Sequence, residues 1–245
     1  MFKSSNPILT KLDNNKDLLD SKTMTINGTI SKTFVLLLIA MISGSAVLHQ
    51  ALAGAADKVT SIMGISLVVG LIAGFVTIFA RSLAKFTSPI YAFAEGALLA
   101  GLSLMFEQQF PGIVVQAVSG TFITFFIMLI LYRTGVIKAT EKFRSVLLTS
   151  MFTIFALYLI QIIGSFFNFS IPFVSGNAPM SILFSGIVVV VASLNLILDF
   201  DFIEQGVQNS LAKDTEWYAA FGLMVTLIWL YIEILNLLAK LRSRD

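Results

Sequence analysis

The stretch Asn195-Leu-Ile-Leu-Asp-Phe-Asp-Phe-Ile-Glu-Gln-Gly206 ends a long apolar run with three carboxylates. A later apolar run, Trp229-Leu-Tyr-Ile-Glu-Ile-Leu-Asn-Leu-Leu238, carries one more acid, Glu233, well inside it. A carboxylate among apolar side chains is costly to bury, so each of these acids needs a partner or a function. The two runs therefore predict apolar helices that hold a few functional acids.

The composition points to a membrane protein. The chain has 245 residues, of which 57% are hydrophobic and 12% are charged, whereas soluble domains carry about 25% charged residues. The net charge of +2 is too small to indicate a nucleic-acid partner. Cysteine is absent and His49 is the single histidine, which excludes thiolate metal sites, cysteine nucleophiles and multi-histidine metal centres.

Seven apolar stretches approach or exceed the roughly 20 residues that an α-helix needs to cross the hydrocarbon core. The loops between them are short and leave no room for a soluble domain. The sequence therefore predicts an all-α, polytopic membrane protein with seven transmembrane helices. The predicted spans are Phe34–Gly54, Val59–Ala80, Pro89–Phe106, Ile113–Tyr132, Val146–Phe167, Met180–Asp199 and Trp217–Leu241.

Three segments follow from this pattern: a polar cytoplasmic tail over residues 1–33, a transmembrane domain over residues 34–241, and a short basic tail over residues 242–245. Lys and Arg concentrate in short cytoplasmic loops of membrane proteins. With a cytoplasmic N-terminus, twelve basic residues lie inside and four outside, so we expect this orientation. The basic C-terminal tail is the discordant feature, because an odd number of spans places it outside.

The acids and one arginine are the candidate functional residues. Glu95 lies six residues beyond Pro89, about 9 Å into the third span at 1.5 Å per residue. Glu233 lies about 15–24 Å into the last span at 1.5 Å per residue, so we expect it to be buried from bulk water, and it has no cation within a helical turn. Asp199 is expected to face the bundle interior, and Arg81 ends the second span on the same side of the membrane.

Asp201 and Glu204 differ from Asp199 in their helical position. Residues two apart are separated by about 200° around a helix, so Asp199 and Asp201 cannot share a face. Asp201 and Glu204 are three apart and do share one. We therefore assign these two to the cytoplasmic rim as solvated residues.

Three interior acids, Glu95, Asp199 and Glu233, face one candidate cation, Arg81. This excess of carboxylates must be neutralised by protons or by a bound cation, and two acids in contact share one proton and titrate as a pair. Oxygen ligands of this kind favour hard cations, of which Ca²⁺ is the natural candidate. The residues alone thus support a pH-gated cation path as a hypothesis. No enzyme is expected, because the catalytic motifs of intramembrane hydrolases are missing.

The order and spacing of several motifs resemble the Bax inhibitor-1 family, also called the transmembrane Bax-inhibitor-motif family, and in particular its bacterial YccA-like branch. The resemblance covers about Phe34 to Leu241. It is carried by Leu198-Asp-Phe-Asp-x-Ile203, by Leu230-Tyr-Ile-Glu-Ile-Leu-Asn-Leu-Leu238, and by Tyr91-Ala-Phe-Ala-Glu-Gly-Ala-Leu-Leu-Ala-Gly-Leu-Ser103.

This resemblance implies a seven-helix bundle with the seventh helix central and a multi-pass location in a bacterial inner membrane. It also implies a pH-sensitive calcium leak in which Asp199 and Glu233 are the proton sensor and gate, and a possible calcium site. Arg81 is similar to the family's second-helix arginine, which can latch onto the sixth-helix acid. The segment between the two acids is about nine residues longer than is usual in the family, and we expect the extra length to form a cytoplasmic extension around Ser210–Glu216.

Three functions stay open: a leak channel, a non-conducting interaction protein and a proton-coupled transporter. The first is a proton-gated calcium leak channel, with the lipid bilayer, calcium and protons as partners, no resident cofactor, and Arg81 and Glu95 as latch or path residues. The second is a non-conducting protein that binds or regulates a membrane protease or another membrane partner. A channel requires a hydrated route past Glu233, whereas an interaction protein would use exposed loops such as Arg133–Arg144.

Overall fold

A computed structural model describes residues 23–176 and 178–244. Most of the segment predicted as a cytoplasmic tail, and residue 245 of the basic tail, lie outside these described residues. Within the described part, the chain is helical apart from its turns and one isolated bridge between Thr23 and Ala212, so the predicted all-α class is confirmed. The helices are α2 (Ile26–Leu52), α3 (Ala56–Phe79), the 3-10 turn η1 (Arg81–Leu83), α4 (Ala84–Gln109), α5 (Ile113–Arg133), α6 (Glu141–Ser165), the short α7 (Pro172–Ser175), α8 (Pro179–Gln208) and α9 (Thr215–Arg242).

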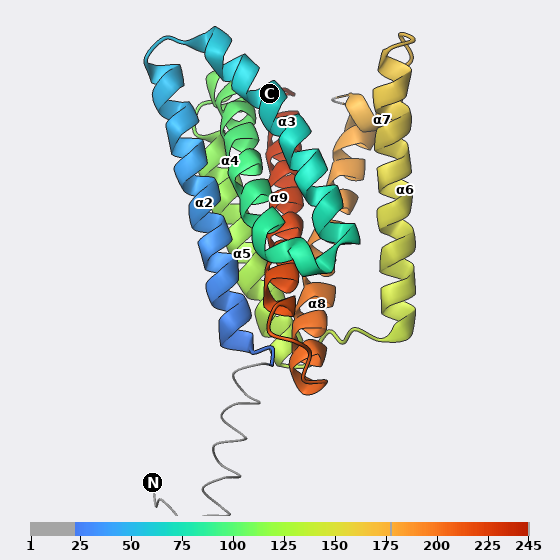
Figure 1. Ribbon diagram of the computed structural model, residues 1–245. Coiled ribbons are helices and arrows are strands. Elements are labelled where there is room, and N and C mark those ends of the chain that lie inside the picture. The colour runs from blue at the N-terminus through green and yellow to red at the C-terminus, as the bar shows by residue number, and fades with distance from the viewer. Residues whose placement is uncertain (1–22, 177, 245) are drawn as a thin grey trace, which may run out of the picture.

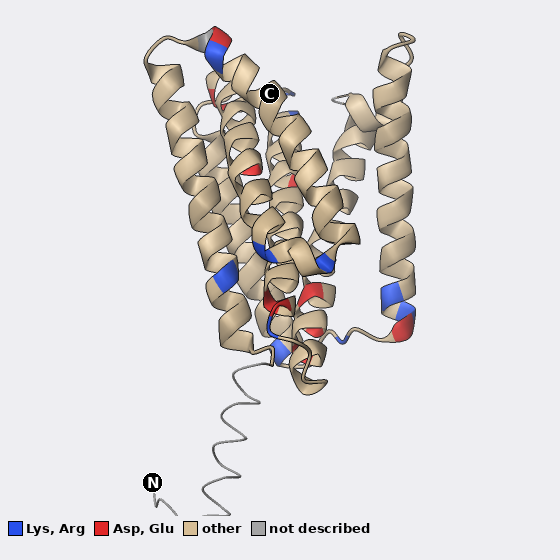
Figure 2. Ribbon diagram, in the orientation of Figure 1, with Lys and Arg blue, Asp and Glu red and all other residues tan. Residues whose placement is uncertain are grey.

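Seven of these helices are long and apolar enough to cross a membrane, which agrees with the predicted count and makes the chain a multi-pass membrane protein. The beginning of α2 and the end of α9 lie at opposite ends of the bundle (Figure 1). Figure 2 shows that charged positions gather at these two ends and are sparse between them. The end where α2 begins is called the N-side below, and the opposite end the C-side.

Two helix boundaries differ from the predicted ones for local reasons. Helix α2 begins at Ile26, eight residues before the apolar run, because the hydroxyl of Thr25 caps it by accepting a hydrogen bond from the Gly28 amide at 3.0 Å. Helix α8 continues for nine residues beyond Asp199, to Gln208. The apolar pattern stops at Asp199, but the helical hydrogen bonds do not, so Asp199 lies within α8 rather than at its end.

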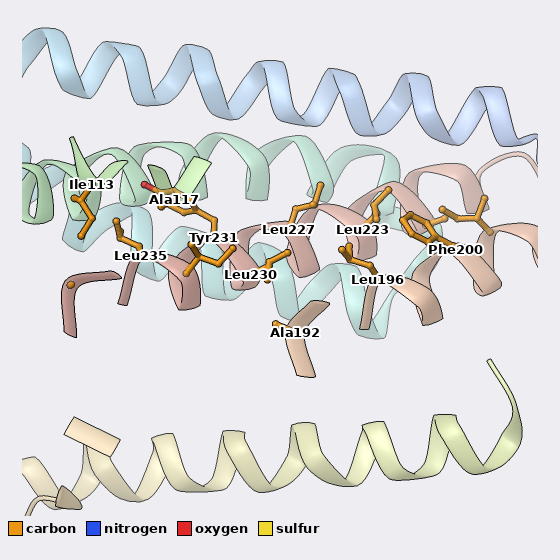
Figure 3. Packing of buried hydrophobic residues seen from close by; sticks show 14 of the residues in the cluster. Ile113, Ala117, Ala192, Leu196, Phe200, Leu223, Leu227, Leu230, Tyr231 and Leu235 are labelled. Atoms are coloured by element: carbon orange, nitrogen blue, oxygen red, sulfur yellow. The ribbon is translucent and has the colours of Figure 1, made fainter. Parts of the chain in front are cut away.

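Helix α9 is the central element, as predicted. It packs against α2, α4, α5 and α8, and Figure 1 shows it surrounded by its neighbours. One set of its buried side chains packs with α2, α3 and α4, and a second set forms an apolar cluster with residues of α5 and α8, shown in Figure 3. The fully buried members of this cluster include Ile113, Ala117, Ala192, Leu196, Leu230 and Leu235.

Small residues allow α2 and α4 to cross closely. A methyl group on Gly96 would overlap the backbone of Ala40, and one on Gly44 would lie 3.1 Å from the carbonyl oxygen of Gly96. The hydroxyl of Ser43 donates to the carbonyl of Phe93 at 2.6 Å across the same crossing. This contact explains the small residue at Gly96 and fixes the position of α4 against the bundle.

Helix α6 has a different environment from the other long helices. It packs against α8 and α7 and stands at the side of the bundle in Figure 1. Only 11% of its most apolar window is buried, against 44% for α8 and α9. The position of α6 therefore depends on a few contacts, and these contacts involve the candidate functional residues.

Candidate functional site

A cavity of about 710 Å³ lies between α3, α4, α8 and α9 on the N-side of the bundle, with one side chain of α6 in its wall. We call it the Asp199 cavity. Its lining includes both apolar residues and a set of polar and charged side chains. This polar set consists of Arg81, Tyr91, Glu95, Asn195, Asp199, Tyr218 and Thr226.

Asp199 reaches this cavity from α8 and faces α9. Its carboxyl group is hydrogen-bonded by the hydroxyl of Thr226, which itself accepts a hydrogen bond from the Asn195 amide at 3.0 Å. Gly222, one turn before Thr226, leaves room for the carboxyl, since a methyl group there would lie 3.9 Å from Oδ1. The second oxygen, Oδ2, is buried and has no hydrogen-bond partner among the described residues. An oxygen in this state requires a proton, a cation or water.

Glu95 enters the same cavity from α4. It is hydrogen-bonded with Tyr91, one helical turn earlier, and it faces α3 at Gly70, where an added methyl group would lie 3.7 Å from Oε1. The structure thus brings Asp199 and Glu95 to one cavity from two different helices. Both acids were predicted to lie in the bundle interior, but the sequence did not predict that these two would share a cavity.

Arg81 lies on the turn η1 at the N-side of the cavity. Its guanidinium group stands over the ring of Tyr218, 4.9 Å from the ring centre, which is a cation–π geometry. Within residues 23–176 and 178–244 it forms no ion pair. The latch to Asp199 that the resemblance implies is therefore not closed here, although both side chains line the same cavity.

A second cavity, of about 730 Å³, lies between α6, α7, α8 and α9 toward the C-side. We call it the Glu233 cavity. The Glu233 side chain is only 2% exposed, and its carboxylate accepts hydrogen bonds from the Tyr158 hydroxyl at 2.9 and 3.0 Å and from the Trp229 indole at 3.1 Å. Lys240 lies in the same cavity and donates to the carbonyl of Val174 and to the Ser185 hydroxyl, both at 2.8 Å.

The structure corrects the predicted pairing of Asp199 with Glu233. The two carboxyls line different cavities and have different hydrogen-bond partners. Thr226, not Glu233, contacts Asp199, and the seven residues from Thr226 to Glu233 span about 10 Å along α9. Glu233 instead joins α9 to α6 through Tyr158. A calcium ion with oxygen ligands at about 2.3–2.6 Å could not bind both carboxyls in this arrangement.

No three His, Cys, Asp or Glu side chains in the described ranges converge as a metal site. The Asp199 cavity nevertheless offers oxygen donors of the kind that hard cations prefer, from two carboxyls, an amide and hydroxyl groups. These donors surround a space rather than a preformed coordination shell. The arrangement suits an ion that passes or binds transiently better than one that is held as a structural metal.

The rim residues were predicted to be solvated: Glu204 is exposed, as predicted, Asp201 is half-buried, and both also have partners on other helices. Asp201 forms an ion pair with Arg144 at 2.9 Å and also accepts from the Gln205 amide at 2.7 Å. Glu204 accepts a hydrogen bond from the Tyr132 hydroxyl. These contacts connect the N-side end of α8 to α6 and α5, so Asp201 and Glu204 position helices around the Asp199 cavity without lining it.

Sequence reasoning missed the buried acid Glu216. It lies at the start of α9, is completely buried, forms an ion pair with Lys32, and accepts from both the amide and the hydroxyl of Thr25 at 2.9 Å. The segment around it was expected to be a cytoplasmic extension. A lysine within the first apolar helix and a glutamate just before the last one are the signal that could have indicated this pair.

The family comparison covers nearly the whole chain. The model of a family described as "Bax inhibitor 1 like" matches residues 6–243. No curated protein and no solved structure matches the chain. Seven apolar helices, of which the last is central, with acids on the sixth and seventh of them, agree with the resemblance seen in the sequence. The chain therefore belongs to the Bax inhibitor 1 like family.

Proposed function

We propose that this protein is a proton-sensitive leak pathway for cations, with calcium as the main permeant ion, and that the Asp199 cavity forms half of the route. One observation carries the proposal: Asp199 presents a buried oxygen without a hydrogen-bond partner in a cavity that also contains Glu95. Buried carboxyls in membrane helices commonly serve ion or proton paths.

The charge of the cavity favours a cation. Asp199 and Glu95 can each carry a negative charge, whereas the basic residue of the lining, Arg81, is engaged with Tyr218. A cation that enters can replace the protons on the two carboxyls, so protons and cations compete for the same oxygens. Flux is therefore expected to rise with pH, because deprotonation leaves two charges that attract a cation.

The roles of the acids differ from those expected at first. Asp199 is the sensor and Glu95 its partner in the cavity, while Glu233 fixes α6 against α9 through Tyr158. Arg81, stacked on Tyr218, narrows the N-side entrance of the cavity and places a positive charge there. No covalent chemistry and no resident cofactor enter this proposal, and its partners are the bilayer, calcium and protons.

The orientation and location follow as part of the same proposal. Lys and Arg gather at the N-side end in Figure 2, and by the positive-inside rule we propose that this end faces the cytoplasm of a bacterial cell, with the protein in the inner membrane. Reporter fusions after Arg133 and after Lys58 test the orientation, since they must report opposite sides.

Calcium flux into proteoliposomes between about pH 6 and pH 8 tests the proposal. Wild-type flux is expected to rise with pH, and Asp199→Asn and Glu95→Gln are each expected to lower it and flatten its pH profile. Asp57→Asn is the matched control, because Asp57 is exposed at the start of α3 and lies outside both cavities. Wild-type flux equal to that of empty vesicles at every pH would rule the leak out.

The second candidate is a non-conducting protein that binds a membrane partner. It is favoured by the limited packing of α6 and by the exposed basic residues Arg133, Lys138 and Lys142 beside its start. Under this reading, replacing these three residues abolishes capture of a co-purifying membrane protein, while Asp199→Asn does not. The flux measurement separates the two candidates.

A further inference from the structure

One side chain, Phe155 of α6, lines both cavities. The Asp199 cavity otherwise draws its walls from α3, η1, α4, α8 and α9, and the Glu233 cavity from α6, α7, α8 and α9. Phe155 is therefore the point where the N-side cavity and the C-side cavity meet. Phe155 is 60% exposed, so it is not packed into the core of the bundle.

The opposite wall at this level is also apolar. On α9, Val225 lines the Asp199 cavity, and Trp229, one turn later on the same face, lines the Glu233 cavity. The polar side chains lie on either side of this level, with Asp199 and Asn195 in one cavity and Glu233 in the other. An apolar level between two polar cavities is the arrangement by which membrane pores exclude water and ions until they widen.

The position of Phe155 depends on the contact described above between Tyr158 and Glu233. Tyr158 follows Phe155 by three residues, so both lie on the same face of α6. The hydroxyl of Tyr158 is hydrogen-bonded to Glu233 of α9, and this bond ties the face of α6 that carries Phe155 to α9. Apart from this bond, α6 packs mainly against α7 and α8, so few other contacts would resist its outward movement.

We propose that Phe155 is the hydrophobic gate of the pathway: with Val225 and Trp229 it forms the constriction that separates the two cavities, and ions pass when α6 moves away from α9. The proposal rests on the leak function proposed above and names the residue that limits it. Asp199 and Glu95 then set which ion reaches the constriction, and Phe155 sets whether it crosses.

Flux in proteoliposomes gives the first test. Phe155→Ala is expected to raise calcium flux about tenfold, the effect of a barrier lower by about 1.4 kcal/mol, and Phe155→Leu is expected to raise it less. Phe152→Ala is the matched control, since Phe152 lies one turn earlier on α6, is 71% exposed and lines neither cavity. Equal flux in wild type and Phe155→Ala, with measurable wild-type flux, would overturn the gate and leave the leak function standing.

A second test does not depend on conduction. The chain contains no cysteine, so Asn236→Cys places a single thiol in the Glu233 cavity. A charged, membrane-impermeant methanethiosulfonate is expected to label this thiol from the C-side only, and adding Phe155→Ala is expected to permit labelling from the N-side as well. Absence of N-side labelling in the double variant refutes the constriction. If wild type conducts nothing but this labelling changes as expected, the leak function fails and the constriction stands.

Discussion

The ion pair at the start of α9 gives a sharp test of how the bundle is held together. Glu216 is fully buried and is bound by Lys32 and by the amide and hydroxyl of Thr25. Replacing one partner of a buried ion pair commonly costs about 3–5 kcal/mol. The Lys32 side chain retains 18% exposure and can regain water, so for Glu216→Ala we take the lower value, about 3 kcal/mol.

The expected loss can be measured as a melting temperature. For a chain of this size, 1 kcal/mol corresponds to about 2–4 °C, so Glu216→Ala is expected to lower Tm by about 6–12 °C in detergent at a fixed heating rate. Glu216→Gln keeps an oxygen acceptor for Thr25 but removes the charge that pairs with Lys32. Its loss is therefore expected to be smaller, at about 1–2 kcal/mol.

Replacing Gly28 by alanine is expected to change stability in opposite directions in two backgrounds. A methyl group on Gly28 would overlap the Glu216 carboxylate, and the carboxylate cannot move away without losing Lys32 and Thr25. Gly28→Ala is therefore expected to destabilise the wild type by about 1–3 kcal/mol. In the Glu216→Ala background the overlap is gone, and the better helix propensity of alanine is expected to stabilise by up to about 1 kcal/mol. Additive effects in this double-mutant cycle would refute the contact.

The remaining predictions concern other contacts of the bundle. Gly96→Ala is expected to destabilise the protein severely, because its methyl group would overlap the backbone of α2; near-normal Tm would contradict the close crossing. Tyr158→Phe removes the bond between α6 and Glu233 and is expected to increase hydrogen exchange in α6 while leaving α9 protected, with unchanged α6 exchange as the contrary result. Arg81→Gln loses the cation–π contact with Tyr218 and is expected to raise the flux by widening the N-side entrance, and a lower flux would show that Arg81 does not guard it.

Most of the architecture could be predicted because the bilayer imposes a simple rule. Each crossing helix needs about 20 apolar residues, and all seven spans were found on this basis. The predicted helix boundaries are wrong where a helix extends beyond the apolar run. The cap at Thr25 starts α2 within a polar segment, and α8 continues past Asp199 through residues bound to α5 and α6.

The candidate site was harder to predict because it depends on helix register. Asp199 and Glu233 were both recognised as interior acids, and both have interior positions. Which residue of α9 faces Asp199 depends on the length of α8 and on where α9 begins, and one helical turn shifts a partner by 5.4 Å. The sequence contains no direct signal for this shift. Thr226 and Tyr158, the actual partners, resemble many other hydroxyl residues within the spans.

The central position of α9 has a consequence for how the protein is made. The six other long helices precede α9 in the chain, yet the apolar faces of α2, α4, α5 and α8 are completed only by α9. Until α9 has been synthesised, the six earlier helices lie in the membrane without the helix that packs between them. They must therefore stay far enough apart for α9 to insert. A stop codon within α9 would therefore remove little of the chain but the central part of its core, and we expect the truncated product to be a substrate for membrane quality control rather than a shortened bundle.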